Sequence, residues 1–172
     1  NYNFIASIPD GTFSTTPRLS VMQIVSNRVT EIGNSAFTGS SLNFIDLSDN
    51  SIQDFNRIPF EGVNATLYSL LLPFNQISSL SEGSFDNLRN LEILQLNYNP
   101  LNNNMPAFIF SSLFNLQQLT LISCGLTELN SQWFNGLSTL KSLHLSYNGF
   151  SELPANVFSM LYGMELVNVA SE

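Results

Sequence analysis

The stretch Leu91-Glu92-Ile93-Leu94-Gln95-Leu96-Asn97-Tyr98-Asn99-Pro100-Leu101 decides how this 172-residue chain folds. Its leucines fit neither one long alternating strand nor one amphipathic helix. They fit a short strand around Leu94 and Leu96, which then turns a corner at Asn99. Because successive strand residues point to opposite faces, both leucines are predicted to face inward, while Ile93 and Gln95 face outward.

The same pattern recurs along the chain every 23 to 25 residues. Apolar residues stand eight, five and three positions before each corner residue and two positions after it. The corner residues are Asn27, Asn50, Asn75, Asn99, Cys124 and Asn148. Ten positions after the corner, most units carry a phenylalanine: Phe13, Phe37, Phe60, Phe85, Phe134 and Phe158. Units of this kind bury their apolar faces only against their neighbours, which predicts a stacked array.

One unit departs from the pattern, the unit that follows Asn99. Ile109 stands at its phenylalanine position and Phe110 comes next. A position that is usually apolar is occupied by Asn104. We therefore expect a one-residue insertion in this unit, after which Met105 replaces Asn104 in the core.

The whole unit, written LxxLxLxxNxLxxLxxxxFxxLxx, resembles the leucine-rich repeat. Its length of about 24 residues and its phenylalanine are similar to the "typical" subclass of extracellular receptors and adhesion proteins, such as Toll-like receptor ectodomains. The resemblance implies an α/β solenoid of about seven repeats that forms a right-handed, horseshoe-shaped arc. A parallel sheet would line its concave face, and loops or short 3-10 turns its convex face.

The array spans residues 1–172 and is expected to form a single domain. Both ends lack the cysteine-bearing caps that are usual in extracellular members of the family, so we favour a fragment of a longer array. The alternative is that another copy, stacked head to tail, covers the open ends.

The corner asparagines are predicted to face inward, where each amide can donate to and accept from buried loop backbone groups. Cys124 takes this place in one unit, and the family pattern tolerates a cysteine there. We expect it to be a buried, packed thiol rather than a reactive one. As the only cysteine, it excludes an intrachain disulfide.

Composition excludes several classes of function. The chain carries a net charge of −8 with only one lysine and four arginines, which disfavours binding to nucleic acid or to an anionic membrane. Hydrophobic residues make up 44% and charged residues 10%, so the chain is expected to form a core. No apolar run approaches the roughly 18 residues of a spanning helix. We therefore predict no nucleic-acid partner and no direct membrane insertion in this segment.

An enzyme is not expected. His144 is the only histidine, so a histidine-based metal cluster cannot form. A catalytic relay would need His144, a nearby serine and a carboxylate, but Asp46 lies four strands away, about 19 Å at the spacing of a sheet. The sequence also lacks a glycine-rich phosphate loop. We predict no catalytic residues, no metal and no cofactor.

The outward positions of the predicted sheet are unusually apolar, and contiguous exposed apolar surface often marks an interaction site. Scattered surface hydrophobes are the alternative explanation. Apolar and aromatic outward residues cluster over three consecutive units, which favours a binding surface. The candidate ligand-binding residues are Phe44, Asp46, Leu71, Phe74, Ile93, Gln95, Tyr98, Thr120, Ile122, His144 and Tyr147.

The favoured function is a non-enzymatic recognition module of a secreted or cell-surface protein, with a protein ligand preferred over a glycan or a lipid. The resemblance implies receptor, adhesion or innate-immune roles. A self-associating structural protein of an extracellular matrix or filament is the runner-up, and an intracellular scaffold is a third possibility. If the protein is secreted, the Asn64-Ala65-Thr66 sequon is a candidate glycosylation site at Asn64.

Overall fold

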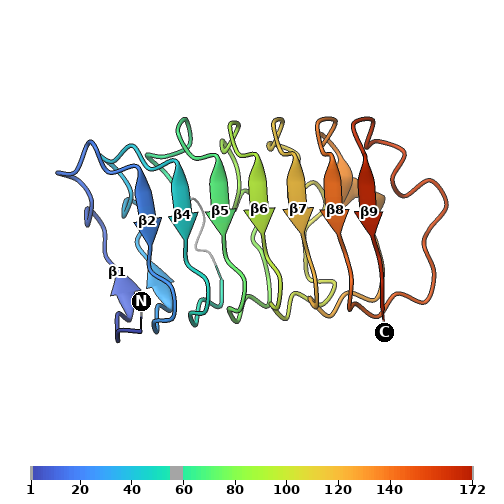
Figure 1. Cartoon of the computed structure of the whole chain (residues 1–172), viewed down its shortest axis with the longest axis horizontal. Helices are drawn as coiled ribbons and strands as arrows, with labels where there is room; N and C mark the ends of the chain where they lie inside the picture. Colours follow the sequence, from blue (N-terminus) through green and yellow to red (C-terminus); the bar gives the residue numbers. More distant parts are fainter. Residues whose placement is uncertain (1, 55–59, 172) are drawn as a thin grey trace.

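The computed structural model describes residues 2–54 and 60–171. Seven short strands, one from each repeat, form a single parallel sheet in chain order (Figure 1). They are β2 (Val21–Gln23), β4 (Phe44–Asp46), β5 (Ser69–Leu71), β6 (Ile93–Gln95), β7 (Gln118–Thr120), β8 (Ser142–His144) and β9 (Leu166–Asn168). The predicted parallel-sheet solenoid is confirmed.

The repeat length sets the register of this sheet. Leu94 of β6 pairs with Leu70 of β5 on one side and with Leu119 of β7 on the other. Each strand residue therefore has the equivalent residues of the two adjacent repeats as its lateral neighbours. Outward side chains consequently form continuous rows across the sheet, about 4.8 Å apart from strand to strand.

The inward leucines and the phenylalanines fill the coil together. Leu94 and Leu96 are completely buried, as are the equivalent leucines of the neighbouring repeats. Phe85 stacks on Phe110 of the next repeat, with ring centroids 5.8 Å apart. Equivalent ring contacts join Phe13 with Phe37, Phe37 with Phe60 and Phe134 with Phe158. Since a buried aromatic ring removes about 150–250 Å² from water, this column is a large part of the core.

The one-residue insertion after Asn99 is confirmed. Asn104 is exposed, whereas Met105 is buried in its place. Phe110 rather than Ile109 continues the aromatic column, and Ile109 is buried beside it. The extra residue is therefore absorbed in the loop, and the strand that follows keeps its register.

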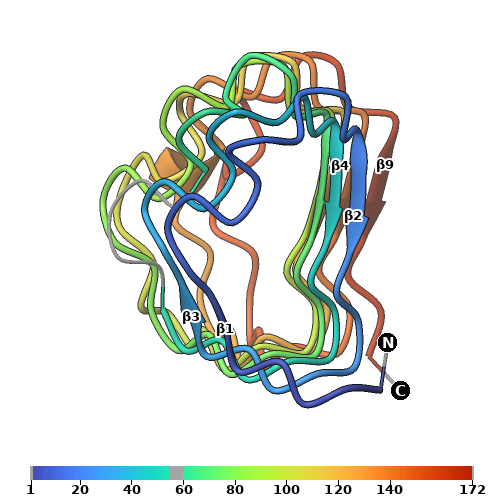
Figure 2. The ribbon, with the colours of Figure 1, turned by 90° about the vertical axis from the view of Figure 1, so that its left-hand side faces the viewer.

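The wall opposite the sheet is mostly irregular. Two short strands, β1 (Ser7–Ile8) and β3 (Glu31–Ile32), pair with each other in parallel across the coil from the main sheet (Figure 2). The single helical segment of the described residues is the 3-10 helix η1 (Ser131–Phe134), whose first turn is capped by the Asn130 side chain. Turns form most of the chain that runs back from the end of one strand to the start of the next. The α component of the predicted α/β solenoid is therefore almost absent.

The corner residues hold neighbouring turns together through their side-chain amides. The Asn99 amide nitrogen donates to the carbonyls of Leu72 and Leu96, both at 2.9 Å. Its oxygen accepts the backbone N–H of Ile77 at 3.0 Å. Asn50, Asn75 and Asn148 make equivalent bonds. Each amide thus satisfies backbone groups of two repeats that would otherwise be buried without partners.

A second polar ladder, which was not predicted from the repeat pattern, runs along the entrance to the strands. It occupies the position nine residues before each of the five corners from Asn50 to Asn148. Each of its side chains donates to a backbone carbonyl of the preceding repeat, at 2.7 or 2.8 Å. Its members are Ser41, Thr66, Asn90, Asn115 and Thr139. The sequence signal was a recurring serine, threonine or asparagine at this position.

Candidate binding face

The outward residues of β4 to β8, with Ile122 just after β7, make up the surface that we call the sheet face. Its central row consists of Asp46, Leu71, Gln95, Thr120 and His144, each paired laterally with the next. The row at the strand entrances contains Phe44 and Ile93, which both lie beside Ser69 of β5. The register therefore brings the sequence-predicted strand residues together on one surface.

Exposure separates these candidates. Phe44, Leu71, Ile93 and Ile122 are half-buried, and so are Asp46, Gln95 and His144. Thr120 differs from the expectation, because only 4% of its surface is exposed. The long side chains of its lateral neighbours, Gln95 and His144, stand on either side of this short one. Thr120 is thus placed on the predicted face but is not presented to a ligand.

The sheet face has a polar part next to its apolar part. The Ser142 hydroxyl and His144 Nε2 are hydrogen-bonded at 2.8 Å on β8. The Thr120 hydroxyl is buried and makes no hydrogen bond in the described part of the chain. Asp46 lies on β4, four strands from His144, and its carboxylate accepts both the backbone N–H and the hydroxyl of Ser48. Ser142 and His144 are therefore not assembled with Asp46 into a relay.

The face carries almost no charge. Asp46 and His144 are the only ionisable side chains of the outward rows between β4 and β8, although the chain as a whole has a net charge of −8. Charged residues are typically depleted at the centre of protein interfaces, whereas the rim is polar and accessible to solvent. The low charge of this face is therefore a property that it shares with the centres of protein interfaces.

The residues just before the corners form a further row, which we call the corner row: Ser26, Asp49, Phe74, Tyr98, Ser123 and Tyr147. All have left-handed backbone, with φ between 53° and 58°. Each donates its N–H to the next repeat at 2.8–3.0 Å. Left-handed backbone is uncommon for bulky residues and was not predicted from the sequence.

Two members of the corner row make the most prominent aromatic feature of the surface. The rings of Phe74 and Tyr98 stack with their centroids 4.3 Å apart and an interplanar angle of 7°. Phe74 remains 54% exposed and Tyr98 45%. Tyr147, two repeats beyond Tyr98, is also 54% exposed. These rings stand at the strand ends, beside the sheet face.

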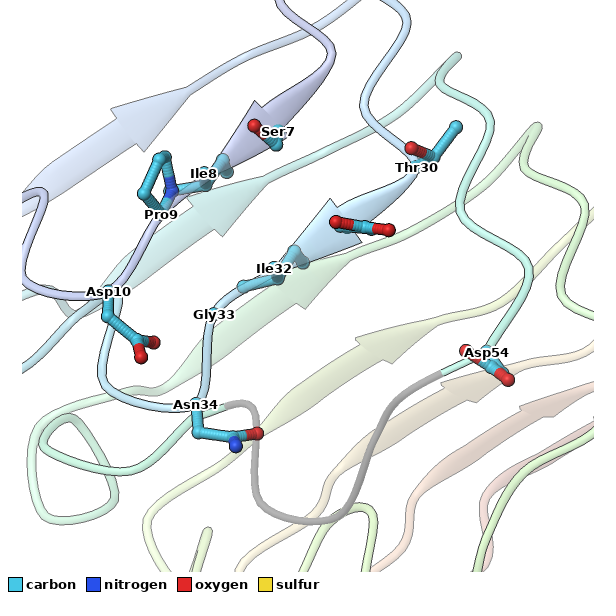
Figure 3. Close-up of a pocket in the computed structure, with 10 residues that line it drawn as sticks. Ser7, Ile8, Pro9, Asp10, Thr30, Ile32, Gly33, Asn34 and Asp54 are labelled. Atoms are coloured by element: carbon cyan, nitrogen blue, oxygen red, sulfur yellow. The ribbon is translucent and has the colours of Figure 1, made fainter.

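A group of metal-binding side chains or a polar hollow could also mark a site in the described part of the chain. The described residues hold no group of three or more His, Cys, Asp and Glu side chains that could bind a metal ion. A hollow beside β1 and β3 is lined by polar groups that include Asp10, Asn34 and Asp54 (Figure 3). There, Asp10 accepts the backbone N–H of Ser35 at 3.1 Å, and its carboxylate therefore supports the loop between two repeats.

Comparison with known families places the chain. The model described as BspA type leucine rich repeat region (6 copies) matches residues 6–103, and the model described as leucine rich repeat matches residues 114–171. The chain belongs to the leucine-rich repeat family. Membership agrees with the fold, and the 24-residue "typical" subclass remains a prediction.

Individual leucine-rich repeat proteins are similar over most of this chain. Keratocan of Mus musculus is 28% identical over 163 residues, which cover 92% of this chain and 44% of keratocan. Leucine-rich repeat-containing G-protein coupled receptor 5 of Rattus norvegicus is 32% identical over 125 residues, or 73% of this chain and 14% of the receptor. The chain spans less than half the length of these relatives.

A solved leucine-rich repeat protein of Leptospira interrogans shares the fold. It superposes on the whole chain with a TM-score of 0.82 at 21% identity, and the match covers 42% of that protein. Within residues 2–54 and 60–171, no helix is long and apolar enough to cross a membrane.

Proposed function

We propose that this chain is a non-enzymatic recognition module that binds a protein ligand through its sheet face. The observation that carries the proposal is the apolar, nearly uncharged surface around Phe44, Leu71 and Ile93, which continues into the stacked Phe74–Tyr98 pair. A sheet that is bonded in register across seven strands presents these side chains on a rigid support. Rigid aromatic and aliphatic anchors are what protein interfaces use as energetic centres.

The proposal includes a secreted or cell-surface protein as the context of this module. The similarity to a G-protein coupled receptor supports it, since a receptor of that class is a cell-surface protein. Receptor, adhesion, matrix and innate-immune roles are all compatible with such a module. A protein ligand is preferred over a glycan or a lipid because apolar and aromatic side chains lie beside uncharged polar ones on this face, a mixture that suits a protein surface.

The test is a binding screen against a panel of purified secreted proteins and receptor ectodomains, read by biolayer interferometry. For any binder, we expect the Leu71→Glu/Ile93→Glu variant to lose about 100-fold in affinity, because two charges would be buried at an apolar contact. Phe114→Glu is the matched control, since Phe114 is 52% exposed but lies outside the strands. Affinity should change little between low and high salt, because the face is nearly uncharged.

A binder that is lost with Phe114→Glu and retained by the Leu71→Glu/Ile93→Glu variant would contradict this placement of the site. Urea unfolding of both variants separates loss of binding from loss of fold.

Glycosylation at Asn64 is a separate expectation of the secreted context. Asn64 is exposed in the turn region that precedes β5, and the hydroxyl of the sequon residue Thr66 donates to the Leu42 carbonyl at 2.7 Å. We predict that protein secreted from eukaryotic cells loses mass on treatment with an N-glycosidase, and that Asn64→Gln abolishes the loss. An unchanged mass for the secreted protein would refute the prediction.

A further inference from the structure

Ser123 stands between Tyr98 and Tyr147 in the corner row, and we call the space above it, between the two tyrosines, the slot. The repeat that separates these two tyrosines carries Ser123 at the equivalent position. All three residues share the same left-handed backbone, with φ of 57°, 53° and 58°. The Tyr98 N–H donates to Ile122 at 2.8 Å, and the Ser123 and Tyr147 N–H groups donate to Ser146 and Ala170 at 3.0 Å. The two tyrosines are thus held by equivalent backbone, two repeats apart.

The width of this slot follows from the repeat spacing. Strands one repeat apart are separated by about 4.8 Å, so equivalent backbone atoms of Tyr98 and Tyr147 are about 10 Å apart. Stacked aromatic rings prefer centroid distances of about 4.5–7 Å, so one ring at the level of Ser123 can stack on both tyrosines at once. The Phe74–Tyr98 pair demonstrates this packing within the same row, at 4.3 Å over a single repeat step.

The two tyrosines that flank the slot are exposed, and its surroundings are uncharged. Tyr98 and Tyr147 are 45% and 54% exposed, and the Ser123 side chain between them makes no hydrogen bond in the described part of the chain. The flanking side chains carry no charge either: Asn97, Ile122 and Ser146 precede this part of the row, and Pro100, Gly125 and Gly149 follow the corners. A guanidinium group would stack here without a carboxylate partner, and a pyranose would find few hydrogen-bonding groups.

We propose that this slot binds an aromatic side chain of the protein ligand, sandwiched between Tyr98 and Tyr147 over Ser123. The proposal rests on the proposed protein-binding function and adds the chemistry of one anchor residue. Two aromatic walls with an apolar neighbour, Ile122, match an aromatic side chain better than any charged or sugar group.

The experiment titrates the acetylated, amidated tripeptide Gly-Trp-Gly into the isotope-labelled protein and follows backbone amide shifts. We expect saturable shifts at Ser123 and Ile122 with millimolar affinity. Ser123→Phe fills the slot, and the chain tolerates an aromatic with this backbone, as Phe74 shows with φ of 56°. It should abolish the shifts, and Tyr147→Ser should weaken binding about tenfold by removing one stacking wall.

Ser26→Phe is the matched control, because Ser26 occupies the same position of another repeat with φ of 55°. It should leave the shifts unchanged. Absence of saturable shifts, or their persistence in Ser123→Phe, would overturn the slot. Tighter binding of Gly-Arg-Gly or methyl glucoside would overturn the aromatic assignment.

These outcomes are separable from a failure of the proposed function. A protein ligand that depends on Leu71 and Ile93, combined with no tripeptide binding, removes the slot and leaves the sheet face. Tripeptide binding together with protein ligands that ignore the sheet face removes the proposed function instead.

Discussion

The inner and outer sides of the Asn99 corner differ in burial and in the contacts that they make. Asn99 points inward, is 1% exposed and bonds backbone groups of two repeats. Tyr98, its neighbour in sequence, points outward, is 45% exposed and stacks on Phe74. Adjacent residues thus differ in role, because one stabilises the coil and the other forms part of its exposed surface.

The Cys124 corner shows how far the inner side can vary. The Cys124 thiol makes one close bond, to the Leu96 carbonyl at 3.3 Å, and has no equivalent of the amide oxygen. The Leu101 N–H, which an asparagine at this corner would accept, donates instead to the Asn99 carbonyl at 2.8 Å. A thiol is therefore tolerated because the preceding loop satisfies its own backbone.

The largest expected loss of stability comes from removing the hydrogen bonds on the inner side of the Asn99 corner. Asn99→Ala leaves the buried Ile77 N–H without its acceptor and removes the bonds to Leu72 and Leu96, so we predict a loss of about 2–4 kcal/mol in the free energy of unfolding. Cys124→Ala should cost less, about 1 kcal/mol, because a thiol is a weak donor. Urea unfolding measures both. Equal losses would contradict the distinction between the two corners.

The pH dependence of stability gives a second way to distinguish the Cys124 corner from the asparagine corners. Burial raises the pKa of the Cys124 thiol from 9.0 to about 12. Above pH 9 the unfolded chain loses this proton while the folded chain keeps it, so the free energy of unfolding falls as pH rises from 9 towards 12. The slope is at most about 1.4 kcal/mol per pH unit.

Cys124→Ala has no thiol to ionise. Above pH 9 its free energy of unfolding should therefore fall less with pH than that of the original chain. Identical pH profiles between pH 8 and pH 10.5 would refute the burial of the thiol. Alkylation of the native thiol at pH 8 should be slow, because the reactive species is the thiolate.

A smaller effect compares Thr120 of the sheet face with Thr139 of the polar ladder at the strand entrances. Thr120 buries a hydroxyl without a hydrogen bond, whereas the Thr139 hydroxyl bonds Phe114 and Leu116 carbonyls at 2.8 and 3.0 Å. Thr120→Val should stabilise the protein by about 1 kcal/mol, and Thr139→Val should destabilise it by a similar amount. Thermal and urea unfolding of the pair test this. Destabilisation by Thr120→Val would show that its hydroxyl has a partner.

The repeat pattern is sufficient to predict the inner half of the molecule. Leu94, Leu96 and Asn99 occupy the same environment in each turn, so their periodicity reports their burial directly. The insertion at Met105 was readable for the same reason, since it broke a known period.

The outer half depends on neighbours one repeat away, and a period does not report those. Thr120 is buried because Gln95 and His144 flank it, although its position in the repeat is outward. The left-handed backbone of Phe74 and Tyr98 follows from the turn that each repeat makes after its strand. The residue types at these positions do not predict this turn. The spacing of the tyrosines was visible, but the slot between them needs that shared backbone.

The most direct test of recognition by the outer surface is the double variant Phe74→Ser/Tyr98→Ser, measured for both affinity and stability. Serine at this position is accepted in two other repeats, at Ser26 and Ser123. For a protein ligand found in the panel, we predict a loss of about 30-fold or more in affinity, with about 1 kcal/mol lost from the free energy of unfolding. Unchanged affinity in a variant that folds normally would contradict the account.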